Sequence, residues 1–569
     1  MKNWINLLLL VTVAIFSLWC TGDLMRKNDQ ATILAGAYDL AHGRLQDPES
    51  YYQFDKTYVL YGVCAAIFKL QNLFSCEMSP IDAANRGLAL VFWSALTILV
   101  VRFRTAISAV DLLCIITAPA ILLNTMYVNS TVLSSAFLIL SACFILHPVR
   151  RGGWLGALLF ALAVGSRADV ILLLPLLLWL STPFSQIKTF PAGFSKQWTL
   201  IVAGIITLIS GRIFCSDGAS IDPIFNAKMV AGYVAFGFGA AGLLFSIYAI
   251  RLTLHAAKSP TWLEKLYGLA GVAAFLLPVI FFLPQLHAPR YFWRGCEAIL
   301  LLAISRRLPI WTCRPGYILL TIAACLPMVL GINLSSLHRP QLTLTAPTLF
   351  PSGDGYYPMG GYAQFLLNMR NANQHPIDHN QVIWTAMQSA KLEFDNHPVL
   401  WSPMFGYFKL AASLQGDVAQ LYSFSDLSNR PFYAESRSLM RKDPKTPLSS
   451  ISDVLHQPSR FISPVLHGVG ILQFGDGDLN WGRQTRLLNH LFSGNEYRVV
   501  TAPDMIPPNR MIWAFSENAF ESAQVDPSTG LYYSNDPKSF SGVGLTFAHT
   551  VLPSWMSLGS FQGNSPQPK

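Results

Sequence analysis

The chain has 569 residues, of which 52% are hydrophobic and only 12% are charged, and its mean hydropathy is +0.39. This balance excludes an ordinary soluble protein and indicates a polytopic membrane protein. The net charge of +9 does not indicate nucleic-acid binding, because the polar part of the chain is nearly neutral: residues 335–569 hold 16 basic and 17 acidic residues. The basic excess therefore lies in the apolar part of the chain, where it sets topology.

Apolar stretches of 14 to 25 residues recur between residues 4 and 335, and about 20 helical residues cross a bilayer. The first stretch, residues 4–20, has a lysine before it and no small-residue cleavage site after it. We interpret it as an uncleaved signal anchor, with a cleaved signal as the alternative. Loops rich in Lys and Arg then alternate with less basic loops. Because basic loops stay in the cytoplasm, this alternation predicts about 11 transmembrane helices and places residues 22–85 outside.

The outer loop contains a candidate catalytic carboxylate. Residues 29–43 begin with Asp29, carry apolar residues at helical spacing and end at Gly43, which predicts a short helix. Asp29 is either the cap of that helix or a general base at the membrane face, with Lys56 holding an anionic group nearby. Residues 57–74 have both ends outside and are predicted to lie along the membrane surface, unless a later assignment is wrong and they span.

The remainder, residues 336–569, has no segment long enough to span. We expect a soluble domain on the outer side, with an α+β fold. Residues 474–480 have oxygen ligands at alternating positions but no acidic residue to close a calcium loop, so we interpret them as a Gly/Asp turn. The predicted strands lie in residues 465–474 and 497–500, and the predicted helices are residues 380–394 and 481–492.

Several short motifs follow one another in a specific order. They are Asn28-Asp29-Gln-Ala with Ala41-His-Gly43, Asp55-Lys56-Thr-Tyr58, Ser79-Pro-Ile-Asp-Ala-Ala-Asn-Arg86, Gly165-Ser-Arg167-Ala-Asp and Ala288-Pro-Arg290-Tyr291. In this order and spacing the chain resembles the GT-C superfamily of membrane glycosyltransferases, in particular the branch of protein mannosyltransferases and aminoarabinose transferases. The resemblance covers roughly residues 1–330. It implies a GT-C-like transmembrane module, residues 1–335, followed by the soluble domain.

The resemblance also implies an activity and a set of roles. A sugar would pass, with inversion, from a polyprenyl-phosphate carrier to an envelope lipid, glycan or protein acceptor at the outer membrane face. Asp29 would deprotonate the acceptor and Lys56 would face the departing lipid phosphate. Arg290 and Arg167 are further candidates for that phosphate, because a guanidinium binds it through two N–H groups. Tyr291 and Tyr58 belong to the same motifs and are counted with them as substrate-binding residues.

This interpretation places the protein in the inner membrane of a bacterium. Its expected partners are the lipid-linked sugar donor, membrane lipid and an unidentified acceptor, without nucleic acid. The sequence departs from the family in two places. Asn28 stands where the first site often has a second acidic residue, and no carboxylate stands near Ser130 and Thr131, where the second outer loop often carries one. A divalent metal is therefore doubtful, because hard cations need oxygen charge.

Two alternatives remain open. The first is a polytopic transporter or flippase for a lipid or glycan, in which Asp29 only caps its helix. Such a transporter should carry acidic residues deep within several spans, whereas Asp111 is the only one well inside a predicted span before Glu264 and Glu297. The second alternative is a noncatalytic GT-C-like scaffold, which the missing second carboxylate favours.

Overall fold

The computed structural model falls into two compact units. Unit 1 comprises Met1–Leu24, Asp55–Val63 and Leu70–Gln374, and unit 2 comprises Met25–Phe54, Cys64–Lys69 and His375–Lys569. Each unit is described by itself below. The structure describes residues 2–22, 28–45, 54–74, 78–103, 106–146, 152–182, 239–282, 289–305, 308, 313–333, 341–343, 349–352, 355–358, 360–373, 399–401, 410, 413–415, 421–423, 470–472, 497–500, 512–515, 524–525 and 532–533.

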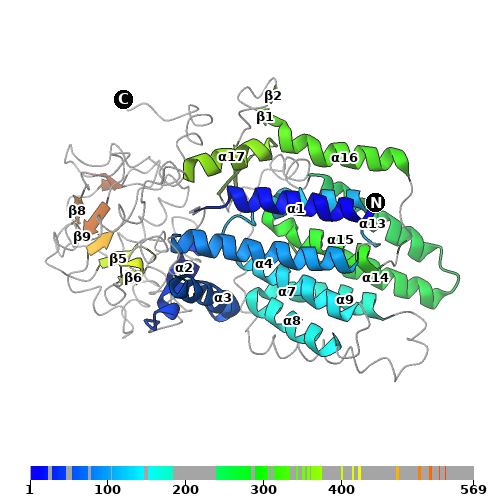
Figure 1. The fold of residues 1–569 in the computed structure, drawn as a ribbon, viewed down its shortest axis with the longest axis horizontal. Helices are drawn as coiled ribbons and strands as arrows, with labels where there is room; N and C mark the ends of the chain where they lie inside the picture. The colour runs from blue at the N-terminus through cyan, green and yellow to red at the C-terminus, as the bar shows by residue number, and fades with distance from the viewer. Residues whose placement is uncertain are drawn as a thin grey trace. The chain divides into compact units, whose positions relative to one another are not determined.

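The described part of unit 1 is mainly helical, and its longer helices lie side by side (Figure 1). Helix α3 (Phe54–Leu73) is shared between the two units. The other helices of unit 1 are α1 (Lys2–Cys20), α4 (Pro80–Arg102), α5 (Ala109–Ile116), α6 (Pro119–Leu122), α7 (Ser130–Ile145), α8 (Gly152–Ser166), η2 (Ala168–Leu173), α9 (Leu174–Ser181), α13 (Gly239–Ala257), α14 (Trp262–Phe281), η5 (Pro289–Phe292), α15 (Trp293–Ser305), α16 (Arg314–Val329) and α17 (Tyr362–Asn373).

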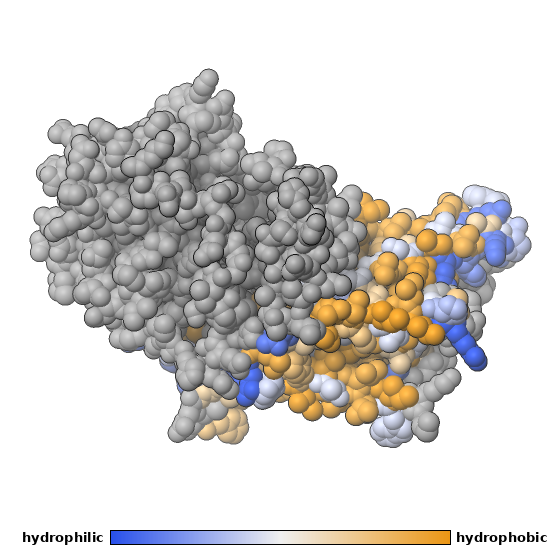
Figure 2. All heavy atoms as spheres, turned by 90° about the horizontal axis from the view of Figure 1, so that it is seen from above, coloured by the Kyte–Doolittle hydropathy of each residue, from blue (hydrophilic) through white to orange (hydrophobic). Residues whose placement is uncertain are grey.

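Three helices in the described residues are long and apolar enough to cross a membrane, namely α4, α13 and α14. Their surfaces expose large apolar side chains such as Leu90, Ile250 and Leu269, and Figure 2 shows hydrophobic residues gathered over much of the coloured surface. Helix α15 differs, because every residue from Trp293 to Ile304 is buried. It is therefore the central helix around which others of unit 1 pack. The larger count of about 11 spans stays a prediction.

Two acidic residues of the apolar stretches, Asp111 and Glu264, lie at helix starts in unit 1. Asp111 lies in the first turn of α5, where its backbone N–H donates to Ser108 Oγ at 3.0 Å. Glu264 lies in the first turn of α14 and forms a capping box with Thr261. Acidic side chains are favourable at such positions because they face the positive end of the helix dipole. The first-turn positions give both carboxylates a structural reason to be there, and their depth in the membrane stays a prediction.

The predicted outer-loop helix is confirmed as α2 (Asn28–Ala41), which begins one residue earlier than expected. Its end follows from Gly43, whose φ of +69° is a conformation that other residues adopt reluctantly. Beyond that turn, the Arg44 N–H donates to the Asp39 carbonyl at 2.8 Å. A glycine placed just after the last helical turn is thus what stops α2.

Short strands follow the helices in the described residues. In unit 1, β1 (Gly331–Asn333) pairs antiparallel with β2 (Gln341–Thr343), and β3 (Leu349–Ser352) pairs antiparallel with β4 (Gly355–Pro358). In unit 2, β5 pairs parallel with β6 and β7, whereas β8 with β9 and β10 with β11 are antiparallel. These strands are β5 (Val399–Trp401), β6 (Leu421–Ser423), β7 (Gly470–Leu472), β8 (Tyr497–Val500), β9 (Ile512–Phe515), β10 (Gln524–Val525) and β11 (Tyr532–Tyr533).

The strand prediction for residues 497–500 is confirmed by β8, and β7 occupies part of the predicted stretch 465–474. The predicted helices 380–394 and 481–492 and the turn 474–480 lie outside the described residues. The division of the chain at residue 335, the fold of the soluble domain and the surface position of residues 57–74 stay predictions.

Gly271 supplies a test of the helix packing. A Cβ atom added to Gly271 of α14 would stand 2.8 Å from the indole nitrogen of Trp179 in α9. We expect Gly271→Ala to lower the free energy of unfolding by about 1–3 kcal/mol, because overpacking forces the helices apart. Gly62→Ala is the matched control, since nothing lies within 4 Å of its added Cβ atom. Equal melting temperatures for the two variants in detergent would contradict this packing.

Candidate functional site

A buried arginine organises the polar interior of unit 1. Arg294, in the first turn of α15, is 1% exposed. Its Nη1 donates to both carboxylate oxygens of Glu297, at 2.8 and 2.7 Å. Its Nη2 donates to Ser134 Oγ of α7 at 2.9 Å and to Asp169 Oδ1 at 2.7 Å, and its Nε donates to the same Asp169 oxygen at 3.2 Å. All three nitrogens of the guanidinium are therefore engaged, which is what a buried cation requires.

The second carboxylate of this network connects Arg294 to one of the predicted arginines. Asp169 Oδ2 accepts a hydrogen bond from Arg167 Nε at 2.7 Å, while Oδ1 faces Arg294. Burial raises the pKa of the Asp169 carboxyl, but the two neighbouring guanidinium groups outweigh burial and hold that pKa below its usual range. Asp169 is thus an ionised bridge between a fully buried arginine and a partly exposed one.

Arg167 reaches from this bridge to the start of α7. Its Nη1 stands 3.4 Å from Ser130 Oγ, and its side chain is 22% exposed. Helix α7 is capped by Asn129, whose side chain accepts from the Val132 N–H. The amino end of a helix carries partial positive charge, so an arginine beside it creates a place that favours an anion.

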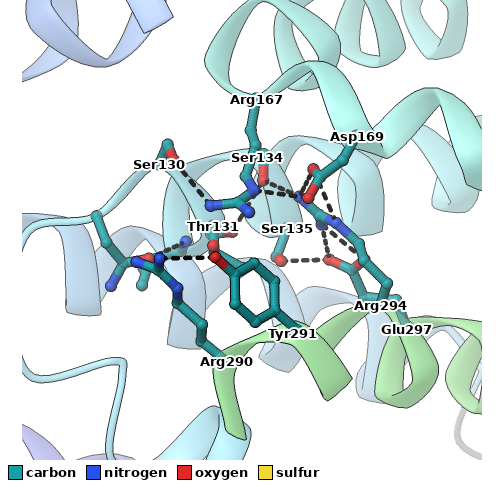
Figure 3. A network of polar contacts seen from close by, with 12 residues as sticks. Ser130, Thr131, Ser134, Ser135, Arg167, Asp169, Arg290, Tyr291, Arg294 and Glu297 are labelled. Atoms are coloured by element: carbon teal, nitrogen blue, oxygen red, sulfur yellow. Dashed lines mark hydrogen bonds and ion pairs between the residues drawn. The ribbon is translucent and has the colours of Figure 1, made fainter. Parts of the chain in front are cut away.

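The predicted pair Arg290 and Tyr291 belongs to the same region. Arg290 Nη2 donates to Tyr291 Oη at 2.9 Å, and the Arg290 guanidinium carbon lies 4.8 Å from the centre of the Tyr291 ring. Figure 3 shows both side chains pointing toward the start of α7, where Ser130 and Thr131 lie, with Arg167 approaching from another side. Residues of two motifs that are more than a hundred positions apart are therefore brought together.

Tyr58 lies beside Gly165, which stands two residues before Arg167 in the chain. A Cβ atom added to Gly165 would stand 2.9 Å from the Tyr58 hydroxyl oxygen and 2.9 Å from Val59 Cγ2. Helix α3 packs closely against the end of α8 because Gly165 has no side chain. Tyr58 is 45% exposed.

The other two predicted residues cannot be placed in the site. Asp29 lies in the first turn of α2 and Lys56 in the first turn of α3, but their side chains are outside the part of the chain that the structure describes. The expected convergence of Asp29, Lys56 and Arg290 on one cavity therefore stays a prediction.

One further residue fixes the approach to α7. Asn85 of α4 is fully buried, and its amide nitrogen donates to the Gly22 carbonyl at 2.8 Å. Its amide oxygen accepts from the Val128 N–H, also at 2.8 Å. The end of the first helix and the segment leading into α7 are thereby joined through one side chain.

Sequence reasoning missed Asp169, Arg294, Ser134 and Ser135, and it treated Glu297 only as a late acidic residue. One signal was available: Arg294 and Glu297 are three residues apart, so they share a face of an otherwise apolar helix. The serines gave no signal, because isolated serines are common in apolar helices. In the described residues there is no group of three or more His, Cys, Asp or Glu side chains that could hold a metal ion.

Comparison of the chain with protein-family models, with curated proteins and with solved structures found no significant match. The class of site therefore rests on its own geometry. What that geometry defines is a cationic region at the amino end of a helix in a helical, apolar protein.

The Arg294 pairings predict a large difference between two ion pairs of unit 1. Arg294→Ala would leave Glu297 buried without its cation and Asp169 with only Arg167, and we expect a loss of about 3–5 kcal/mol of unfolding free energy. Arg86→Ala removes the partly exposed pair with Asp82, whose arginine side chain is 42% exposed, and should cost less than about 1 kcal/mol. Denaturant unfolding of both purified variants measures this, and a smaller effect for Arg294→Ala would contradict the network.

Proposed function

We propose that this protein is a GT-C-type membrane glycosyltransferase that uses a polyprenyl-phosphate-linked sugar as donor. The proposal includes about 11 transmembrane helices in a bacterial inner membrane and an α+β domain on the outer side. The acceptor is an envelope lipid, glycan or protein. Asp29 acts as the base, Lys56, Arg290 and Arg167 face the phosphate, and Tyr291 and Tyr58 complete the donor site.

The observation that supports the proposal most is the meeting of Arg167 with Arg290 and Tyr291 at the start of α7 (Figure 3). The motifs by themselves make Arg167 and Arg290 candidates for the lipid phosphate and place Tyr291 among the substrate-binding residues. Two guanidinium groups and a helix amino end make a region suited to a phosphate oxygen, since each favours negative charge. Arg294 is not a competitor for this role, because its nitrogens are engaged by Glu297, Ser134 and Asp169.

The proposed reaction is a single displacement. The Asp29 carboxylate accepts the proton of the acceptor hydroxyl or amide as the acceptor atom bonds to the anomeric carbon. The bond between that carbon and the phosphate oxygen breaks, and the polyprenyl phosphate leaves with the electron pair. Arginines near the phosphate stabilise the charge that develops on the departing oxygen.

One observation bears on the transporter alternative. Glu297 and Asp111 are buried acidic residues of unit 1, at 3% and 8% exposure. Buried acids in membrane helices commonly belong to ion or proton pathways. Here, however, Glu297 accepts from both Arg294 and Ser135, and Asp111 accepts from the Tyr248 hydroxyl. Such engaged carboxylates fit a structural role better than transport.

The proposal predicts that Asp29→Asn lowers sugar transfer by about 10²- to 10⁴-fold, the usual contribution of a general base. The measurement uses membranes containing each variant, supplied with a panel of radiolabelled polyprenyl-phosphate sugars. Asp82→Asn is the matched control, because this carboxylate pairs with Arg86 in the first turn of α4. It should leave transfer within about twofold of the unchanged protein, as surface ion pairs contribute little.

Equal transfer by wild type and Asp29→Asn would remove Asp29 from the mechanism. Absence of transfer from every donor tested would contradict the glycosyltransferase proposal and favour the transporter or the scaffold. Flux of a labelled lipid or glycan across proteoliposomes would then separate those two.

A further inference from the structure

The Nε side of the Arg167 guanidinium is fixed by a hydrogen bond, while its terminal nitrogens lie toward the proposed phosphate region. Its Nε donates to Asp169 Oδ2 at 2.7 Å. In the described residues, the other hydrogen bond from its guanidinium is the long one from Nη1 to Ser130 Oγ, at 3.4 Å. An arginine held in this way presents the two terminal nitrogens as a fork, which is the geometry that binds a phosphate through two hydrogen bonds.

Asp169 cannot readily follow Arg167 if that side chain moves. Its other oxygen accepts two hydrogen bonds from Arg294, which in turn is fastened to Glu297 and Ser134. Figure 3 shows this chain of contacts running from α15 through Asp169 to Arg167. A tight turn contributes as well, because the Val170 N–H donates to the Arg167 carbonyl at 3.3 Å. The position of Asp169 is thus set by buried groups.

We infer that Asp169 is a positioning residue, which holds the Arg167 guanidinium ready for the phosphate of a polyprenyl-phosphate ligand. The inference rests on the proposed function, because it assumes that Arg167 binds that phosphate. An arginine side chain left free must be ordered when the ligand binds, and this ordering weakens binding. With Asp169 in place, the ordering is already present in the ligand-free protein.

The direction in which Kd changes when the Asp169 charge is removed distinguishes positioning from electrostatic repulsion. A carboxylate near an anion repels it, so removal of the Asp169 charge alone would tighten phosphate binding. Loss of positioning would weaken it instead. Asp169→Asn keeps the size of the side chain while removing the charge, so it distinguishes the two effects by the direction of the change in Kd.

The test measures binding of farnesyl phosphate, a short polyprenyl monophosphate, to the purified full-length protein in detergent by calorimetry. Neutral farnesol shows how much of the binding depends on the phosphate. We expect Asp169→Asn to weaken the phosphate-dependent part of binding by about 2- to 10-fold, the range for ordering one long side chain. Asp82→Asn should leave Kd unchanged, since its carboxylate lies outside the network.

A double-variant comparison shows whether Asp169 acts through Arg167. In the Arg167→Ala background, Asp169→Asn should cause no further loss of binding, because the group that it positions is gone. If Asp169→Asn does not fold, as judged by its melting temperature, Asp169→Glu replaces it in both backgrounds. That variant keeps the charge but moves the carboxylate by one methylene, so it should weaken binding only where Arg167 is present.

The outcomes are distinct. Wild-type protein that binds farnesyl phosphate no better than farnesol overturns the proposed function and this inference together. If wild type prefers the phosphate but Asp169→Asn binds it equally or more tightly, the positioning role is overturned and the proposed function stands. Equal losses from Asp169→Asn with and without Arg167 also overturn it, because Asp169 would then act by another route.

Discussion

The need to pair one buried guanidinium governs the interior of unit 1. Arg294 is 1% exposed, and a cation at such a depth is tolerated only when its hydrogen-bond donors are engaged and its charge is balanced. Glu297 of the same helix and Asp169 of another segment balance the charge, while Ser134 accepts a further hydrogen bond. The pairing therefore fixes α15, α7 and η2 in one arrangement, with specificity of packing as its main consequence.

The same requirement separates the roles of the arginines. All three guanidinium nitrogens of Arg294 form hydrogen bonds inside the protein, so its role is structural. Arg167 shares Asp169 with it but keeps its terminal nitrogens toward Ser130, and Arg290 points with Tyr291 to the same helix start. The proposed anion site at this place would thus be a consequence of how the buried charges are satisfied. In the proposed glycosyltransferase, that anion is the lipid phosphate.

Local signals in the sequence predicted local structure well. The apolar spacing after Asp29 and the glycine at position 43 predicted α2 to within one residue at its start, because capping and left-handed turns depend on neighbouring residues only. The motifs also singled out Arg167, Arg290 and Tyr291. They could not predict that Asp169 bridges Arg167 to Arg294, because that contact joins positions 125 residues apart. Periodicity likewise did not indicate that Asp111 and Glu264 lie in first helical turns, because only the polar capping residues before them mark where those helices begin.

In the proposed glycosyltransferase, Arg167, positioned by Asp169, and Arg290 together bind a lipid phosphate at the start of α7. An electron cryomicroscopy structure of the full-length protein in lipid nanodiscs with farnesyl phosphate tests it most directly. We expect phosphate density within about 3 Å of the terminal nitrogens of Arg167 and of Arg290, at charge-assisted hydrogen-bond distance. Phosphate bound elsewhere, or an Arg167 side chain turned away from Asp169 in the bound protein, would contradict it.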